Sequence, residues 1–156
     1  TQAIPTEKLN FHDIVYTIAN DVKESGMLKG MEFSFDIPLN CYINGNNALL
    51  NSTILNLIKN SVAYSRGTQI RLFTLNDSFD SYTFRYYDNG TGVEEEHIPY
   101  LFDRFYRIDA GRSRKAGGTG LGLPIVKNTI LTHGGKITVR NRPQGGLEFT
   151  FTLPKF

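Results

Sequence analysis

The sequence contains no tryptophan, a single cysteine and no long uninterrupted apolar segment. Because Cys41 stands alone, an internal disulfide and a multi-cysteine metal site are both excluded, as is typical of a reducing compartment. No run of about 18 apolar residues predicts a transmembrane helix, and no signal peptide is recognisable at the start. The formal net charge is only +2, without a basic stripe of the kind that binds nucleic acid. A membrane-spanning segment, a disulfide scaffold and a nucleic-acid-binding protein are therefore not expected.

The chain does contain enough apolar sequence for one hydrophobic core, since 40% of its 156 residues are hydrophobic. Apolar residues at helical spacing predict helices, and alternating apolar and polar residues predict strands. With no linker or repeat between them, these elements predict a single α+β domain over residues 1–156. We expect a two-layer sandwich, in which helices cover one face of a mixed, mostly antiparallel sheet. The predicted helices are 11–25, 47–65, 94–101 and 120–132, the predicted strands are 31–37, 70–74, 82–86, 136–141 and 147–153, and a turn at 76–78 and a mobile loop over 108–118 are also predicted.

Two glycine clusters are the most informative feature of the sequence. Asp88-Asn89-Gly90-Thr91-Gly92, followed by Val93, comes at the end of a predicted strand, and Gly118-Thr119-Gly120-Leu121-Gly122 opens a predicted helix. Glycine allows a backbone to approach a ligand closely and to direct its N–H groups at phosphate oxygens. A carboxylate among glycines can accept a hydrogen bond from the amino group of a base. Together the clusters predict a nucleotide-binding site.

This predicted site differs from the best-known phosphate-binding loops. The second cluster lacks the Gly-x-x-x-x-Gly-Lys-Ser/Thr pattern of a P-loop and the Gly-x-Gly-x-x-Gly spacing of dinucleotide-binding proteins. What remains is a glycine-rich start of a helix, where free N–H groups and the helix dipole favour phosphate. Many helices begin after glycines, so the signal is specific only in combination with the first cluster.

Polar residues on the second predicted helix extend the site. Asn56, Asn60 and Tyr64 follow an i, i+4, i+8 pattern and therefore project from one side of the helix. They could simply lie on a solvated face. Alternatively, the carbonyl oxygen of Asn60 could bind Mg²⁺, which usually takes few protein oxygens beside waters and substrate phosphates. Tyr64 would then lie against the base or the ribose.

These motifs resemble those of sensor histidine kinases. Asn56-Leu57-Ile58-Lys59-Asn60 resembles the N box of that family, and the segment from Asp88 to Gly92 resembles the G1 box. Leu101-Phe102-Asp103-Arg104-Phe105-Tyr106-Arg107 is similar to the F box, and the segment from Gly118 to Leu123 is similar to the G2 box. The order and the spacing of the boxes also match, and the resemblance covers essentially the whole chain.

The resemblance implies the Bergerat ATP-binding fold, which gyrase, MutL and a class of heat-shock chaperones share. It implies that Asp88 recognises the adenine amino group and that Asn60 holds Mg²⁺. Tyr106 and Arg107 would face the phosphates at the base of a lid formed by residues 108–117. Basic residues of that lid could reach the γ-phosphate, although a solvated basic loop would also explain them: Arg112, Arg114 and Lys115.

The sequence departs from the family pattern at three positions. Ala63 stands where a lysine or arginine is common, so phosphate contacts are weakened or shift to the lid. Asn46 stands where an acidic residue is usual, and we expect a structural role for it. Glu148 stands near a place where threonine is frequent, which puts a water-mediated adenine contact in doubt.

Position 56 bears on which of the fold's reactions this chain supports. Gyrase-like ATPases and the serine kinases of the superfamily have a glutamate four residues before the Mg²⁺ asparagine, and this glutamate can activate a water or a hydroxyl. Asn56 cannot act as such a base, whereas a neutral histidine acceptor already offers a lone pair. The substitution favours phosphoryl transfer to histidine over hydrolysis, with Asn56, Asn60 and Arg107 as the catalytic candidates.

The acceptor histidine is expected outside this chain. His12 has an adjacent acid but lacks the proline that usually follows an acceptor, and His97 and His133 look structural or capping, with His133 suited to the helix dipole. We therefore expect acceptor helices upstream of Thr1.

The expected function is ATP-dependent phosphorylation of that histidine, with ATP and Mg²⁺ as cofactors. The expected partners are the dimerisation helices of the parent kinase and a response regulator. The isolated domain should be monomeric and the whole kinase a homodimer, with the domain cytoplasmic and the parent protein an inner-membrane sensor. A non-catalytic nucleotide sensor and a gyrase- or chaperone-type ATPase remain as alternatives.

Overall fold

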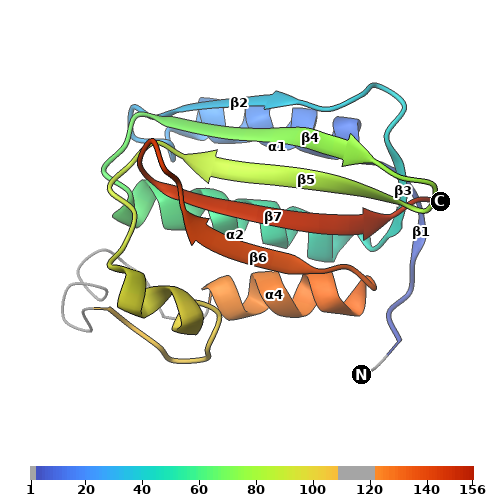
Figure 1. Ribbon diagram of the computed structural model, residues 1–156. Helices are drawn as coiled ribbons and strands as arrows, with labels where there is room; N and C mark the ends of the chain where they lie inside the picture. The colour runs from blue at the N-terminus through green and yellow to red at the C-terminus, as the bar shows by residue number, and fades with distance from the viewer. Residues whose placement is uncertain (1–2, 109–121) are drawn as a thin grey trace.

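The computed structural model describes residues 3–108 and 122–156, which form one layer of sheet and one layer of helices (Figure 1). The strands are β1 (Glu7–Asn10), β2 (Glu32–Asp36), β3 (Tyr42–Gly45), β4 (Gln69–Asp77), β5 (Ser81–Asp88), β6 (Ile137–Asn141) and β7 (Leu147–Pro154). The helices are α1 (Phe11–Ser25), α2 (Asn47–Tyr64), the 3-10 helix η1 (Glu95–Tyr100) and α4 (Gly122–Thr132).

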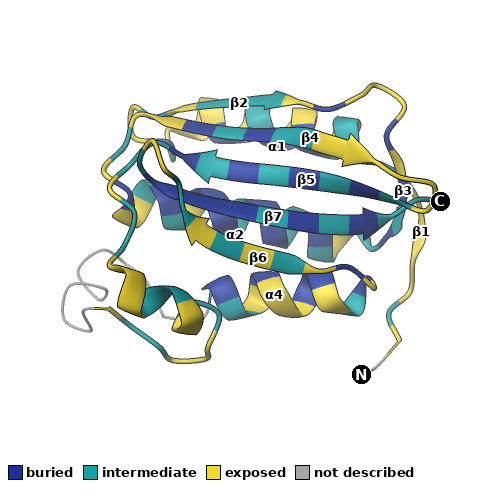
Figure 2. Ribbon diagram, viewed as in Figure 1, coloured by how far each residue is buried: buried dark blue, intermediate teal, exposed yellow. Residues whose placement is uncertain are grey.

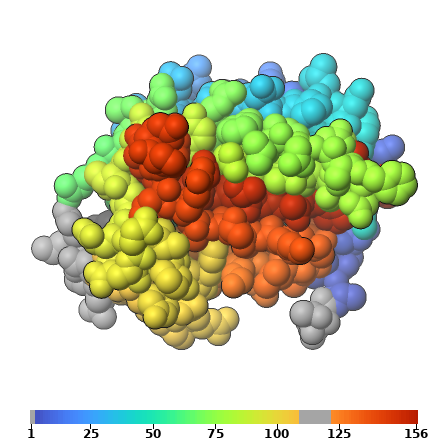
Figure 3. All heavy atoms as spheres, viewed as in Figure 1, coloured from blue at the N-terminus to red at the C-terminus, as the bar shows by residue number. Residues whose placement is uncertain are grey.

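The main sheet has five strands in the order β2-β4-β5-β7-β6. Only β2 and β4 pair in parallel, and the other neighbours pair antiparallel, so the prediction of a mixed, mostly antiparallel sheet is confirmed. In Figure 1 the helices α1 and α2 lie behind this sheet, and Figure 3 shows its other face without a covering helix. The order places β5 and β7, which carry the ends of two site loops, side by side at the centre.

The core lies between the sheet and the helices. The strand β5 alternates strictly between half-buried and buried residues, so that one of its faces lies against the helices (Figure 2). Helix α1 begins at a side-chain cap, because Asn10 accepts from the backbone N–H of Asp13, and it ends at Gly26 with a φ of 78°. The largest fully buried side chains are Tyr86, Phe11, Phe84, Phe149 and Phe151.

Most predicted elements are present, and the differences have simple causes. A second sheet, formed by the antiparallel pair β1 and β3, was not predicted, because each strand has only four residues and their pairing is not local. The turn between β4 and β5 is later than predicted, since Asn76 and Asp77 pair with Thr83 and Tyr82 after a register shift. The short helix at 94–101 is a 3-10 helix. The predicted loop beyond residue 108 lies outside the described residues.

None of the described helices is both long enough and apolar enough to span a bilayer.

Candidate nucleotide-binding site

A small cavity lies where the C-terminal end of α2 meets the ends of the central strands. Its volume is about 40 Å³, which is room for a water molecule and too little for a purine, so a bound base requires side chains to move. Five of the lining residues were predicted from the sequence: Asn60, Tyr64, Asp88, Gly92 and Val93. The described residues that line it are Asn60, Tyr64, Ser65, Asp88, Gly92, Val93 and Leu147.

Asp88 is the only carboxylate among the described lining residues, and only 2% of the residue is exposed. Its Oδ1 accepts from the backbone N–H groups of Gly90 at 3.1 Å and of Leu147 at 3.3 Å. Burial raises the pKa of the Asp88 carboxyl, while these donors and Ser61 act in the opposite direction. A carboxylate in this position can accept a hydrogen bond and cannot donate one.

Two residues that were not predicted from the sequence, Ser61 and Tyr86, position the Asp88 carboxylate through hydrogen bonds. The Ser61 hydroxyl donates to Asp88 Oδ2 at 2.9 Å and lies 2.8 Å from the hydroxyl of Tyr86. Tyr86 in turn donates to the carbonyl of Leu57 at 2.9 Å. Neither belongs to a recognisable motif: Ser61 follows Asn60 in the same helix, and Tyr86 follows the strand alternation that leads to Asp88.

The glycines of the first cluster lie very close to neighbouring parts of the chain. A Cβ at Gly90 would lie 2.1 Å from the carbonyl oxygen of Ser65, so no side chain fits there. Gly92 has a φ of 66°, in the left-handed region that favours glycine. Val93 follows it at the cavity, and the side chain of Asn141 fixes this turn by accepting from Val93 N at 2.9 Å and donating to Val93 O at 2.7 Å. Asn141 is a further positioning residue that sequence reasoning missed.

The two asparagines of α2 differ in their surroundings. Asn60 lines the cavity, and its amide has no hydrogen-bond partner in the described part of the chain. Asn56 lies outside the lining; its amide donates to Ser52 at 3.3 Å, and its oxygen would lie 3.8 Å from a Cβ at Gly122. The start of α4, where the second glycine cluster ends, is therefore next to Asn56.

The candidate Mg²⁺ site fits a metal held mainly by substrate. Among the described residues, no group of three or more histidine, cysteine, aspartate or glutamate side chains could hold a metal ion. The free amide oxygen of Asn60 at the cavity is a hard ligand of the kind that Mg²⁺ accepts beside phosphates and waters.

The F-box residues lie directly after η1. The ring nitrogen Nδ1 of His97 hydrogen-bonds the Tyr106 hydroxyl, and the Tyr106 ring packs against that of Tyr100 at 5.4 Å between centroids. His97 is thus structural, as expected, and Arg107 is half-buried beside Tyr106. The remaining predicted contacts with phosphate lie outside the described residues: Arg112, Arg114, Lys115, Gly118, Thr119, Gly120 and Leu121.

Glu148, which the sequence marked as a departure from the family pattern, is engaged in ion pairs and is not among the described residues that line the cavity. It forms ion pairs with Arg140 and, at 3.6 Å, with Arg85, and it alternates along β7 with the core residues Leu147 and Phe149. Its side chain therefore lies on the face of the sheet away from the helices, and its neighbour Leu147 lines the cavity.

Asn46 and His133 form a structural link, as expected for Asn46. Asn46 caps α2 by accepting from Leu49 N at 3.1 Å, and its backbone N–H donates to His133 Nε2 at 3.0 Å. Nδ1 of His133 lies 2.7 Å from the carbonyl of Thr129, which can only accept, so this nitrogen is the donor of the pair. His133 therefore joins the two helices by hydrogen bonds, and its bond to a carbonyl in the last turn of α4 agrees with the predicted structural or capping role.

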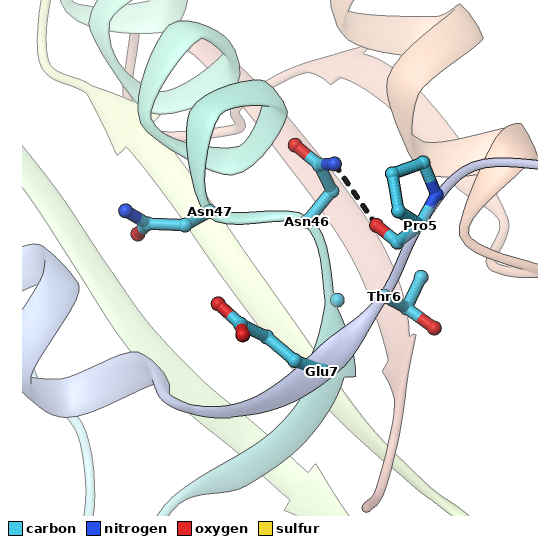
Figure 4. A pocket seen from close by; sticks show the side chains of 6 residues that line it. Pro5, Thr6, Glu7, Asn46 and Asn47 are labelled. Atoms are coloured by element: carbon cyan, nitrogen blue, oxygen red, sulfur yellow. Dashed lines mark hydrogen bonds between the residues drawn. The ribbon is translucent and has the colours of Figure 1, made fainter.

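A larger hollow of about 210 Å³ lies at the opposite end of α2, against β1 (Figure 4). The polar atoms of Asn46 that border it are already bonded, to Leu49 and to the carbonyl of Pro5 at 2.9 Å. The hollow contains none of the predicted site residues, so its chemistry does not compete with that of the cavity at Asp88. Its lining is Pro5, Thr6, Glu7, Gly45, Asn46 and Asn47.

Known proteins with this sequence pattern are nucleotide-binding kinases and ATPases. The sequence profile of the family described as histidine kinase-, DNA gyrase B-, and HSP90-like ATPase matches residues 45–156. The phosphate regulon sensor protein PhoR of Haemophilus influenzae is 38% identical over 122 residues, which is 78% of this chain and 28% of PhoR. The sensor histidine kinase CusS of Escherichia coli is 34% identical over 155 residues, 98% of this chain and 32% of CusS. The chain thus spans about a third of the length of these relatives.

The fold agrees with solved structures as well. The catalytic domain of histidine kinase ThkA superposes with a TM-score of 0.81 at 22% identity, covering 97% of both chains. This similarity confirms the predicted α+β fold. The family profile shows that the chain belongs to the histidine kinase-, DNA gyrase B- and HSP90-like ATPase family, and the curated relatives place it with the catalytic, ATP-binding domains of sensor histidine kinases.

Proposed function

We propose that residues 1–156 form one catalytic domain that binds Mg²⁺·ATP and transfers the γ-phosphate to a histidine on separate dimerisation helices. The observation that carries this proposal is the buried acceptor carboxylate of Asp88 in the same cavity as the amide of Asn60, which has no hydrogen-bond partner among the described residues. Asp88 would select the adenine amino group, and Tyr64, which is 39% exposed at the rim, would cover the base or the ribose.

The phosphates would extend from this cavity toward the start of α4. Asn60 would hold Mg²⁺, which supplies neutralisation of the charge on the phosphate oxygens. Gly122 opens α4 next to Asn56, so the N-terminus of this helix faces the same region as the N box. Tyr106, Arg107 and Arg114, with the cluster from Gly118 to Gly122, are the proposed phosphate contacts.

The surroundings of Asn56 support transfer to histidine over hydrolysis. An amide cannot remove a proton from water, and Asn56 is bonded to Ser52, which is no stronger base. A neutral imidazole attacks through an existing lone pair. Catalysis would then consist mainly of positioning the γ-phosphate and neutralising its charge.

The acceptor and the downstream partner belong to the rest of the proposed kinase. His12 lies in α1, 3.2 Å from Asp13 and with its ring near Phe35, far in sequence from the site, which supports a separate acceptor. We infer a homodimeric parent, a monomeric isolated domain, and a position on the cytoplasmic side of an inner-membrane sensor. A response regulator is the proposed phosphate recipient; one solved structure contains histidine kinase ThkA in complex with response regulator TrrA.

Phosphoryl transfer is tested by mixing this domain with the purified dimerisation helices of its parent kinase and γ-labelled Mg²⁺·ATP. We expect acid-labile, alkali-stable label on the helices, and little phosphate release from the domain alone. Asp88→Ala is the matched inactive variant. Label that never reaches the helices would contradict kinase activity, and sustained phosphate release by the domain alone would indicate an ATPase instead.

A further inference from the structure

We propose that Ser61 is a specificity-determining residue of the adenine site, because it occupies one acceptor position of Asp88 and leaves the carboxylate a single lone pair for the base. This inference rests on the proposed nucleotide site. It concerns a residue of α2 that lies outside the sequence boxes quoted above and whose hydroxyl bonds Asp88 and Tyr86.

The number of donors around Asp88 carries the argument. A carboxylate offers about four acceptor positions. Oδ1 uses two of them for the N–H groups of Gly90 and Leu147, and Oδ2 uses one for the Ser61 hydroxyl. The remaining position on Oδ2 belongs to a residue that lines the cavity, so it is available to one donor of a ligand.

The proton positions follow from the same contacts. Ser61 has one hydroxyl hydrogen, and ionised Asp88 can only accept, so this hydrogen points to Oδ2 at 2.9 Å. Tyr86 must then be the donor within its pair with Ser61. Its single hydroxyl hydrogen is therefore shared between the Ser61 oxygen and the carbonyl of Leu57. Burial raises the pKa of Tyr86 well above its ordinary value, which keeps this phenol a donor. The chain of donors therefore runs from Tyr86 through Ser61 to Asp88.

This arrangement favours a purine with an amino group at C6. A carboxylate held ionised by three donors accepts from that amino group, whereas a 6-oxopurine presents a second acceptor there and is rejected. Burial raises the pKa of Asp88, and it is opposed by the Gly90, Ser61 and Leu147 donors and by the charge of Arg142. Without the Ser61 donor this opposition is weaker, so the protonated form would persist to higher pH. A protonated Asp88 accepts the amino group poorly, so Ser61 sets the pH range over which adenine is selected.

The first test needs no nucleotide. The Asp88 carboxyl is titrated by ¹³C NMR in the free domain and in Ser61→Ala, which removes the hydroxyl with little change in volume. We expect the midpoint of Asp88 to rise by about one to two pH units in the variant. Thr53→Val is the matched control: Thr53 is a buried hydroxyl on the same helix without a hydrogen-bond partner among the described residues, so the midpoint should not change. An equal midpoint in Ser61→Ala would overturn the proposal.

The second test measures selectivity. Affinities for an ATP analogue and for purine riboside triphosphate, which lacks the amino group, are compared between pH 5 and 8. In Ser61→Ala the preference for the ATP analogue should disappear at higher pH than in the unmodified chain, toward about a tenfold loss at the acid end. A preference reduced equally at every pH would show that Ser61 only fills space.

Tyr86→Phe provides a second variant that leaves Ser61 in place. It should shift the Asp88 midpoint in the same direction and by less, so the proposal remains testable if Ser61→Ala fails to fold. No shift in Tyr86→Phe would remove tyrosine from the chain of donors. If the unmodified chain binds neither nucleotide, the proposed function itself fails, which the titration distinguishes from a failure of the Ser61 contact.

Discussion

At the scale of single residues, Asp88 carries its charge in one of the most enclosed parts of the domain. Its pKa is raised in the folded state, chiefly by burial, so folding favours the protonated carboxyl. The contribution of Asp88 to stability is therefore greatest below the pKa of the unfolded chain and decreases as pH rises through the folded pKa. At neutral pH the ionised side chain lowers the stability of the domain in exchange for base recognition.

Replacing Asp88 by asparagine should separate these two effects. The oxygen of the introduced amide would still accept from Gly90 and Leu147, and its NH₂ group would donate to Ser61, whose hydrogen would turn to Tyr86. For Asp88→Asn we expect a melting temperature at pH 7 equal to or above that of the unmodified chain. Affinity for the ATP analogue should fall roughly ten- to 150-fold, with a relative gain for inosine triphosphate.

Calorimetric titration and thermal melting measure both effects, with Asp88→Ala as the control that offers neither donor nor acceptor. Unchanged adenine affinity in both variants would contradict the role of Asp88.

The second residue-scale prediction concerns Asn60. Because its amide oxygen lies at the cavity without a hydrogen-bond partner in the described part of the chain, Asn60→Ala should leave the fold intact and weaken nucleotide binding chiefly in the presence of Mg²⁺. We expect about a tenfold or greater loss with Mg²⁺ and little loss in chelator. The same loss under both conditions would contradict a metal ligand. Asn51→Ala, which removes an exposed pair with Asn47 on the same helix, is the control.

At the scale of elements, hydrophobic periodicity was sufficient to predict the three long helices and the five strands of the main sheet. Each of these elements buries one face, so the spacing of apolar residues within a short stretch of sequence is enough to indicate it. The strands β1 and β3 were missed because their pairing joins Glu7 to Gly45 across an intervening helix and strand. Local patterns do not contain such a pairing.

The residues of the candidate site could likewise be predicted only where they belong to a local sequence motif. Asp88, Asn60 and Gly92 belong to motifs, and the structure brings them together at one cavity. Ser61, Tyr86 and Asn141 could not be found, since a serine in a helix or a tyrosine in a strand acquires its role only through a tertiary contact.

The first glycine cluster gives a prediction at this scale. Gly90→Ala should destabilise the domain by about 2 kcal/mol or more, because its Cβ would lie 2.1 Å from a backbone oxygen that cannot move away cheaply. Gly122→Ala is the control from the second cluster: its nearest neighbour would be a side-chain oxygen at 3.8 Å, so stability should change by no more than about 1 kcal/mol. Urea unfolding measures both. Equal stabilities would mean that the first loop can relax.

The N-terminal cap of α2 gives another. Asn46→Ala removes the cap of α2 and the bond to Pro5, and should cost about 1 kcal/mol. Asn47→Ala at the exposed neighbouring position should cost less than about 0.5 kcal/mol. A reversed order in urea unfolding would contradict the role of Asn46.

At the scale of the whole molecule, Cys41 reports on the integrity of the fold. It has 0% exposure, and burial raises the pKa of its thiol to about 12, with Asp77 adding to the effect. Since the thiolate is the reactive form, labelling by a thiol reagent at pH 8 should require unfolding. We expect labelling of the native domain at least about 100-fold slower than of the urea-unfolded chain. Native labelling at the rate of a free thiol would show that the region around β3 opens locally.

The bond from Leu147 to Asp88 spans 59 positions of the chain, and it joins the central strand to the last hairpin. Recognition of the base therefore cannot exist in a partly folded domain whose C-terminal hairpin has not docked. Such long-range closure is slow compared with helix formation, so ATP should bind only at the end of folding. A nucleotide at about 100 times its dissociation constant would then add about 2.7 kcal/mol to the stability of the finished domain and nothing to its intermediates. In a cell, ATP would therefore stabilise only those copies of the domain that have folded completely.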